Sequence, residues 1–180
     1  MLYMFFANGF EEVEAIATLD VIRRAGIEIQ SVGIGSEIIQ GSHNMKFVCD
    51  KTDSDVSIEN NLTGVILPGG MPGTTNLMNS SVVNEFIDYC ISNNLLVCAI
   101  CAAPMILGKK GILKGKEAIC FPGFENELIG AKISDKFVCR DGNIITAKGM
   151  GSAINFGLEI VAALTDSTTA EKLKTTLQCS

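Results

Sequence analysis

The residue best placed for chemistry is Cys101, which follows an apolar run and precedes two alanines and a proline. The stretch "NLLVCAICAAPMIL" predicts a buried strand over Leu95–Ile100 that ends directly at this cysteine. Proline is tolerated in the first turn of a helix, so a helix is expected from Pro104 to about Lys110. A sharp strand-to-helix turn lifts its corner side chain out of the sheet, as a nucleophile elbow does. The pattern therefore predicts that Cys101 acts as a nucleophile.

The start of a helix also favours the charged form of a nearby thiol. Such positions lower a cysteine pKa from ~8.5 to ~5 or 6, which increases the thiolate fraction at neutral pH roughly thirty-fold. Ala102 and Ala103 leave space for a ligand, and Gly69-Gly70 in "VILPGG" lets backbone N–H groups approach an oxyanion. The alternative interpretation is a buried core thiol, because free cysteine also behaves as a small apolar residue.

The remaining cysteines and the single histidine argue against other thiol chemistry. Cys98 and Cys101 form a C-x-x-C, but Cys98 lies inside the predicted strand, and an offset of three predicts that the two side chains lie on opposite faces. The seven cysteines are irregularly spaced and are interpreted as reduced thiols of an intracellular protein, not as a disulfide framework. With His43 as the only histidine, a zinc site is not expected. We expect no cofactor.

Composition narrows the class of partner. The formal net charge of −6 argues against nucleic acid as a primary partner, because phosphate binding needs clustered Lys and Arg. No apolar run approaches the ~18 residues of a membrane span. The start "MLYMFFANGFEEVEA" has no basic leader and is interpreted as a first core strand, so the cytoplasm is the default location.

Strand-like and helix-like segments alternate along the whole chain, which predicts one α/β domain over residues 1–180 with a mainly parallel sheet. In such sheets ligands bind beyond the carboxyl ends of the strands, where "LPGG" and "AICAAP" lie. An Asp141-Gly142 pair between apolar runs predicts a hairpin. The other expected strands are Leu2–Ala7, Ile29–Gly33, 64–70, which runs into a glycine-rich turn, and Glu117–Cys120, with added β structure over Gly41–Asp50. The other expected helices are Phe10–Ala25, Val82–Ile91 and Ser152–Leu164.

Four motifs in order resemble the ThiJ/PfpI superfamily and, within it, the Parkinson-protein (DJ-one) branch of deglycases and glyoxalases III. The resemblance covers nearly the whole chain and implies a flavodoxin-like three-layer sandwich, similar to class I glutamine amidotransferases, that usually forms a homodimer. The motifs are "NGFEEVEAIATLDVIRRAG", "VILPGGMPGTTNL", "AICAAPMIL" and "DGNIITAKGMGSAINFGLEIVAAL".

The resemblance also implies a catalytic pair, with Cys101 as the reactive residue and Glu14 as the acid beside it. It makes the backbone N–H groups of Gly70 and Ala102 the oxyanion donors. A carboxyl near a thiolate in a partly dry pocket is expected to be pushed towards its protonated form, and can then donate a hydrogen bond to sulfur and pass a proton to substrate. Spacing alone does not choose Glu14 over Glu11 and Glu12. Those two fit surface acids that complement the helix dipole.

The sequence departs from the superfamily pattern at three positions. The PfpI peptidase branch has a histidine after its cysteine, whereas this chain has Ala102, which argues against a Cys-His peptidase. Many deglycase-branch members have a histidine where "CFPG" has Phe121. Relatives often have an arginine where "GSHN" has His43, which is expected either at a polar contact in the pocket or dimer interface, or on the plain surface. Phe121, His43 and Gly69 are therefore candidate pocket residues.

Two functions follow as hypotheses. The first is a cysteine-dependent glyoxalase or deglycase, which acts on methylglyoxal, glyoxal or their adducts on proteins without metal, nucleotide or glutathione. The alternative is an oxidative-stress sensor or redox-regulated chaperone, because an accessible cysteine of low pKa is oxidised by peroxide. Both hypotheses require Cys101 to be reachable.

Overall fold

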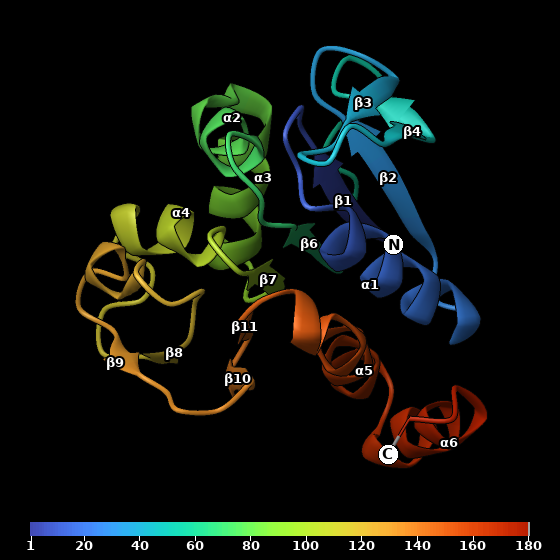
Figure 1. The fold of residues 1–180 in the computed structure, drawn as a ribbon, viewed down its shortest axis with the longest axis vertical. Coiled ribbons are helices and arrows are strands. Elements are labelled where there is room, and N and C mark those ends of the chain that lie inside the picture. The colour runs from blue at the N-terminus through green and yellow to red at the C-terminus, as the bar shows by residue number, and fades with distance from the viewer. Residues whose placement is uncertain (180) are drawn as a thin grey trace.

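The computed structural model describes residues 1–179 and is built on a seven-stranded sheet with the order β10-β11-β7-β6-β1-β2-β5 (Figure 1). Neighbouring strands pair in parallel, except that β10 is antiparallel to β11. The mainly parallel sheet predicted from the alternating pattern is confirmed. The strands are β1 (Leu2–Phe6), β2 (Ile29–Gly33), β5 (Lys51–Thr52), β6 (Gly64–Leu67), β7 (Leu96–Ile100), β10 (Val138–Asp141) and β11 (Ile144–Ala147).

Helices cover both faces of the sheet and bury a core on each side (Figure 1). One core packs against α1 (Glu12–Arg24), α5 (Ala153–Leu164) and α6 (Ser167–Thr176). The other packs against α3 (Ser81–Ser92) and α4 (Pro104–Lys109), with the short α2 (Gly73–Asn79) on the same side. Because both faces are covered, the central strands are apolar at every position, and the three-layer sandwich is confirmed.

Small additions surround the sheet. The added β structure is a hairpin of β3 (Ile38–Gln40) and β4 (Lys46–Val48), and β8 (Glu117–Ala118) pairs with β9 (Lys132–Ile133). The predicted β10–β11 hairpin is present with its turn one residue later, since Asp141 pairs with Ile144 and leaves residues 142 and 143 in the turn. Two short 3₁₀ helices complete the described chain, η1 (Glu125–Glu127) and η2 (Met150–Ser152).

The strand order reverses between β1 and β6, which creates the crevice used by ligands in sheets of this kind. From β1 the chain crosses by α1 to β2 on one side, whereas β6 continues to β7 on the other side. The turns that follow β6 and β7 contain Gly69-Gly70 and Cys101. Every helix within residues 1–179 is too short or too polar to cross a bilayer.

Candidate active site

Cys101 occupies a sharp corner directly after β7. Its φ of +64° lies in the left-handed region, which costs a residue other than glycine about 1–2 kcal/mol. Two backbone hydrogen bonds hold the corner: the N–H of Cys101 donates to the carbonyl of Ala147 at 2.9 Å, and the N–H of Phe121 donates to the carbonyl of Cys101 at 2.8 Å. The predicted strand-to-helix elbow is present, with a half-buried thiol at its corner.

The corner also changes how Cys101 relates to Cys98. Cys98 is fully buried in the core beneath α1 and α5, and Cys101 packs against that same core. The prediction that the two side chains lie on opposite faces is therefore wrong, because the left-handed residue interrupts the alternation of the strand. Both cysteines are free thiols.

Glu14 reaches the thiol from the buried face of α1 and is only 1% exposed. Glu11 caps this helix, since its carboxylate accepts a hydrogen bond from the N–H of Glu14 at 2.7 Å. The side chain of Glu14 accepts a hydrogen bond from the N–H of Gly69 at 3.1 Å and lies beside the Cys101 side chain. The structure thus brings Glu14 and Cys101 together.

Position 69 has room only for a glycine, because the side chains of Glu14 and Cys101 both approach its α-carbon. A Cβ at this position would lie 2.5 Å from Cβ of Cys101 and 2.5 Å from Oε2 of Glu14. Gly70 has a φ of +90°, and a Cβ there would lie 2.4 Å from the backbone nitrogen of Glu11. Gly69 therefore lets the turn lie against both functional side chains, and Gly70 lets it lie against the backbone that leads into α1.

The buried carboxyl of Glu14 is a weak acid. Burial, with a contribution from the charge of Glu11, raises its pKa to about 7, although the Cys101 thiol and the N–H groups of Gly69 and Met150 act in the opposite direction. The expected shift towards the protonated form is present. A carboxyl with this pKa exchanges protons readily at neutral pH.

The thiol of Cys101 is also a weak acid, which contradicts the pKa of ~5 or 6 expected at a helix start. Burial, the charge of Glu14 and the hydrogen bond to Glu14 raise the pKa of Cys101 to about 12, while the N–H groups of Gly70 and Ala102 lower it. The helix α4 has only six residues, and its dipole does not outweigh the loss of water and a neighbouring carboxylate. Protonation of Glu14 removes two of the three unfavourable contributions, so the two groups titrate as a coupled pair.

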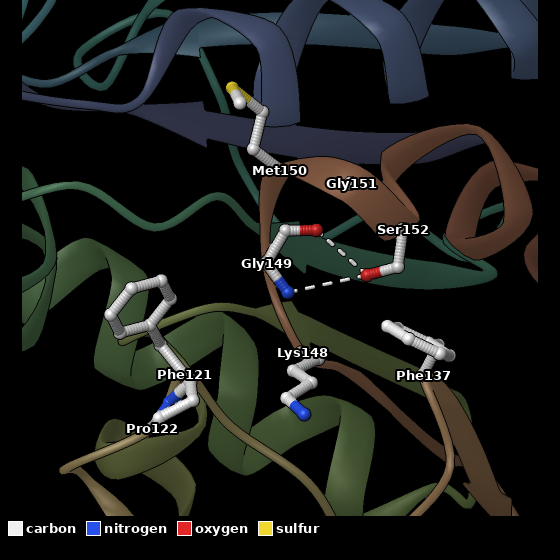
Figure 2. A pocket seen from close by; sticks show the side chains of 8 residues that line it. All are labelled: Phe121, Pro122, Phe137, Lys148, Gly149, Met150, Gly151 and Ser152. Atoms are coloured by element: carbon white, nitrogen blue, oxygen red, sulfur yellow. Dashed lines mark hydrogen bonds between the residues drawn. The ribbon is translucent and has the colours of Figure 1, made fainter.

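A cavity of about 310 Å³ lies beside Gly149, between Phe121 and Phe137 (Figure 2). Gly149 is part of its wall, and a Cβ at this position would lie 3.2 Å from the ring of Phe121 and 3.8 Å from Oε1 of Glu14. Ser152 holds Gly149 in place by accepting from its N–H at 3.2 Å and donating to its carbonyl at 2.7 Å, as the dashed lines show. The cavity is lined by Phe121, Pro122, Phe137, Lys148, Gly149, Met150, Gly151 and Ser152.

Of the three candidate pocket residues, Phe121 lines this cavity, whereas Gly69 and His43 do not. Sequence reasoning missed Phe137, Lys148 and Met150, which also line it. An exposed aromatic or lysine near a hairpin carries no chemical signal of its own. Their relevance follows only from the packing that brings the end of β11 beside Glu14.

His43 belongs to a separate cluster around Glu12. Its Nδ1 lies 3.0 Å from Oε2 of Glu12 and 3.1 Å from Oγ of Ser42, and its backbone N–H donates to Oε1 of Glu12 at 2.7 Å. Burial alone raises the pKa of Glu12, but the hydrogen bonds from His43 outweigh it and lower that pKa, and they raise the pKa of His43. Glu12 is 1% exposed, so its interpretation as a surface acid is wrong.

The Glu12 cluster has the donor types of a metal site. Ligand atoms of Glu11, Glu12 and His43 lie within 4.8 Å of one another. The carboxylates of Glu11 and Glu12 already accept backbone hydrogen bonds, from Glu14 and His43 respectively. These contacts tie the start of α1 to the β3–β4 hairpin.

Comparisons with known proteins give a consistent relationship. The sequence model described as "DJ-1/PfpI family" matches residues 1–163. Protein dj-1beta of Drosophila melanogaster is 36% identical over 161 residues, which are 88% of this chain and 86% of that protein. The glutathione-independent glyoxalase DJR-1.2 of Caenorhabditis elegans is 31% identical over 156 residues, which are 86% of this chain and 82% of that protein. The structure of Toxoplasma gondii DJ-1, described as oxidized, superposes with a TM-score of 0.94 at 29% identity, covering 99% of this chain and 98% of that chain.

Proposed function

Because the chain belongs to the DJ-1/PfpI family, with its flavodoxin-like fold, we propose that it converts 2-oxoaldehydes into 2-hydroxy acids without glutathione. Methylglyoxal and glyoxal, free or as adducts on proteins, are the proposed substrates. The observation that carries the proposal is the convergence of a half-buried Cys101 thiol and a buried Glu14, whose pKa is about 7, on the same side of Gly69. The glyoxalase name of the Caenorhabditis relative supports the same reaction class.

The first step uses Glu14 as a general base. A thiol whose pKa is raised to about 12 is a poor nucleophile by itself and needs a base in contact with it. As the sulfur of Cys101 attacks the aldehyde carbon, the S–H proton passes to the Glu14 carboxylate, and the electrons of the C=O double bond move to oxygen. We assign the stabilisation of that developing oxyanion to the N–H groups of Gly70 and Ala102, which also lower the pKa of the Cys101 thiol.

The second step moves a proton between adjacent carbons. The proton on Glu14 goes to the oxyanion and gives a hemithioacetal, and the carboxylate formed then removes the hydrogen from the former aldehyde carbon. The electrons of the broken C–H bond give an ene-diolate, and Glu14 delivers the proton to the former ketone carbon. The hydroxyl proton of the hemithioacetal passes through the same carboxyl to the second oxygen, which gives a thioester of the 2-hydroxy acid. Water cleaves the thioester and restores the Cys101 thiol, so one carbon is oxidised, its neighbour is reduced and no external oxidant is needed.

This scheme assigns every proton transfer to one residue. Phe121 stands where many relatives have a histidine, and its side chain has no proton to exchange. Glu14 meets the requirement alone because its pKa lies near the working pH and its carboxyl touches the thiol.

The most direct test is lactate formation from methylglyoxal by the full chain. We expect activity in the wild type and a complete loss in Cys101→Ala. Cys179→Ala is the matched control, because Cys179 is also a partly exposed free thiol but lies near the C-terminus. Lactate formed by Cys101→Ala at the wild-type rate contradicts the proposal.

A homodimer and a cytoplasmic location are part of the proposal. Exposed apolar residues of α1, η2 and α5 line one groove, among them Val13, Met150 and Ile154. An apolar face of this kind is a suitable surface for a second copy of the chain.

Oxidation of Cys101 is the second candidate function. Five of the other cysteines are buried, and Cys101 is partly exposed beside an acid that can donate a hydrogen bond to an oxidised sulfur. The raised pKa of the thiol slows attack on peroxide, which favours catalysis as the primary role. The intact mass after mild peroxide treatment tests this candidate, which requires Cys101 to gain the first oxygen.

A further inference from the structure

We propose, on the basis of the function proposed above, that the cavity lined by Phe121 and Phe137 binds the substituent of the 2-oxoaldehyde. An aromatic substituent fits it best, so aryl 2-oxoaldehydes are preferred over methylglyoxal. The cavity is called the aryl pocket below and consists of the eight residues of Figure 2.

The aryl pocket lies next to the reacting atoms. Gly149 separates the pocket from Glu14, and the position of its missing Cβ is 3.8 Å from Oε1 of Glu14 and 3.2 Å from the Phe121 ring. The backbone N–H of Phe121 donates a hydrogen bond to the carbonyl of Cys101. The pocket therefore begins beside the acid that the proposed reaction uses, and a substituent on the carbon next to the reacting aldehyde is proposed to enter it from there.

The size and lining of the aryl pocket suit a ring. An apolar cavity of ~150 Å³ is enough to bind benzene, and this pocket has about 310 Å³. Figure 2 shows the rings of Phe121 and Phe137 on opposite sides of Gly149. They are 47% and 65% exposed, so a bound ring covers apolar surface that otherwise faces water, and it stacks on or meets the edge of both rings.

The only charged side chain in the lining belongs to Lys148. Its Nζ lies 5.4 Å from the centre of the Phe137 ring, and its backbone N–H donates to the carbonyl of Phe137 at 2.9 Å. Within residues 1–179 no carboxylate lies within ion-pair distance of this ammonium group. Lys148 is therefore available to the carboxylate of a 2-hydroxy acid product that holds its ring in the pocket.

The kinetic test compares phenylglyoxal with methylglyoxal. We expect the wild type to prefer phenylglyoxal in kcat/KM. Phe137→Leu is expected to lower kcat/KM for phenylglyoxal about fivefold to tenfold and to leave methylglyoxal within twofold. Ile133→Ala is the matched control, an exposed apolar residue that does not line the pocket. An unchanged ratio in Phe137→Leu overturns the aryl pocket while leaving the proposed function intact.

A binding test needs no turnover. Mandelate and lactate are titrated by calorimetry into Cys101→Ala at pH 6, where Glu14 is mostly protonated. We expect mandelate to bind at least tenfold more tightly than lactate, and Lys148→Met to weaken mandelate about fivefold, with Lys136→Met as the control. Equal affinity for the two acids overturns the aryl pocket. Tight mandelate binding without turnover by the wild type retains the pocket and rejects the proposed function.

Discussion

The carboxyl of Glu14 and the thiol of Cys101 meet over Gly69, although one belongs to α1 and the other follows β7. The contact places a group with a pKa of about 7 against a sulfur with a pKa of about 12. Near neutral pH the thiol keeps its proton, and the carboxyl of Glu14 is the group that gains or loses one. The chemistry of this pair is therefore that of a thiol activated by an adjacent base, and not of a preformed thiolate.

The first prediction concerns the pH dependence of catalysis. The scheme needs Glu14 ionised before substrate attack, so kcat/KM for methylglyoxal is expected to rise with pH through an apparent pKa near 7. Glu14→Gln is expected to lose this rise and to lower the rate by ~10²–10⁴. The measurement is lactate production between pH 5 and 9, and a wild-type rate that is flat across this range contradicts the assignment.

The second prediction concerns stability. Because the folded-state pKa of Glu14 lies above the ordinary 4.5, the native protein binds a proton that the unfolded chain has released. The free energy of unfolding therefore falls as pH rises from about 4.5 to 7, by on the order of 3 kcal/mol. Glu14→Gln is expected to be more stable than the wild type at pH 8 and nearly equal to it at pH 4.5. Urea denaturation at both pH values measures the difference in unfolding free energy between the variant and the wild type. A difference that is the same at pH 4.5 and pH 8 contradicts the prediction.

The third prediction concerns the approach of the two groups. Gly69→Ala puts a Cβ 2.5 Å from both Cys101 and Glu14, so we expect a loss of about 1–3 kcal/mol in stability together with a loss of activity. Wild-type thermal unfolding together with wild-type lactate formation in Gly69→Ala is the contradicting result.

The fourth prediction concerns assembly. Ile154→Glu introduces a charge into the exposed groove between α1 and α5, and is expected to convert the proposed dimer into a monomer. Ile129→Glu, at another exposed isoleucine, is expected to leave the dimer intact. Light scattering after size-exclusion chromatography measures the mass, and a monomeric wild type rejects the proposal.

The sheet was predictable because its strands are buried on both faces and so stand out as apolar runs, such as Leu2–Phe6. The helices α2 and α6 were missed. α6 is largely exposed and polar, and α2 is only seven residues long, so neither carries a clear apolar stripe.

The site was predictable only in part. Cys101 stood out by its position after a strand, but the choice of Glu14 over Glu11 and Glu12 depended on the family resemblance. Spacing shows neither that Glu12 is buried under His43 nor that the thiol is withdrawn from water. Both are properties of tertiary packing, and the second, together with the charge of Glu14, reversed the expected direction of the Cys101 pKa.

The most direct measurement is the titration of the Cys101 thiol, followed by ultraviolet absorbance as the difference between the wild type and Cys101→Ala. A proton shared with Glu14 predicts a wild-type thiol pKa well above ~8.5 and a lower value in Glu14→Gln, where the negative neighbour is gone. A wild-type thiol that ionises below pH 7, or one whose titration is the same in Glu14→Gln, contradicts the account.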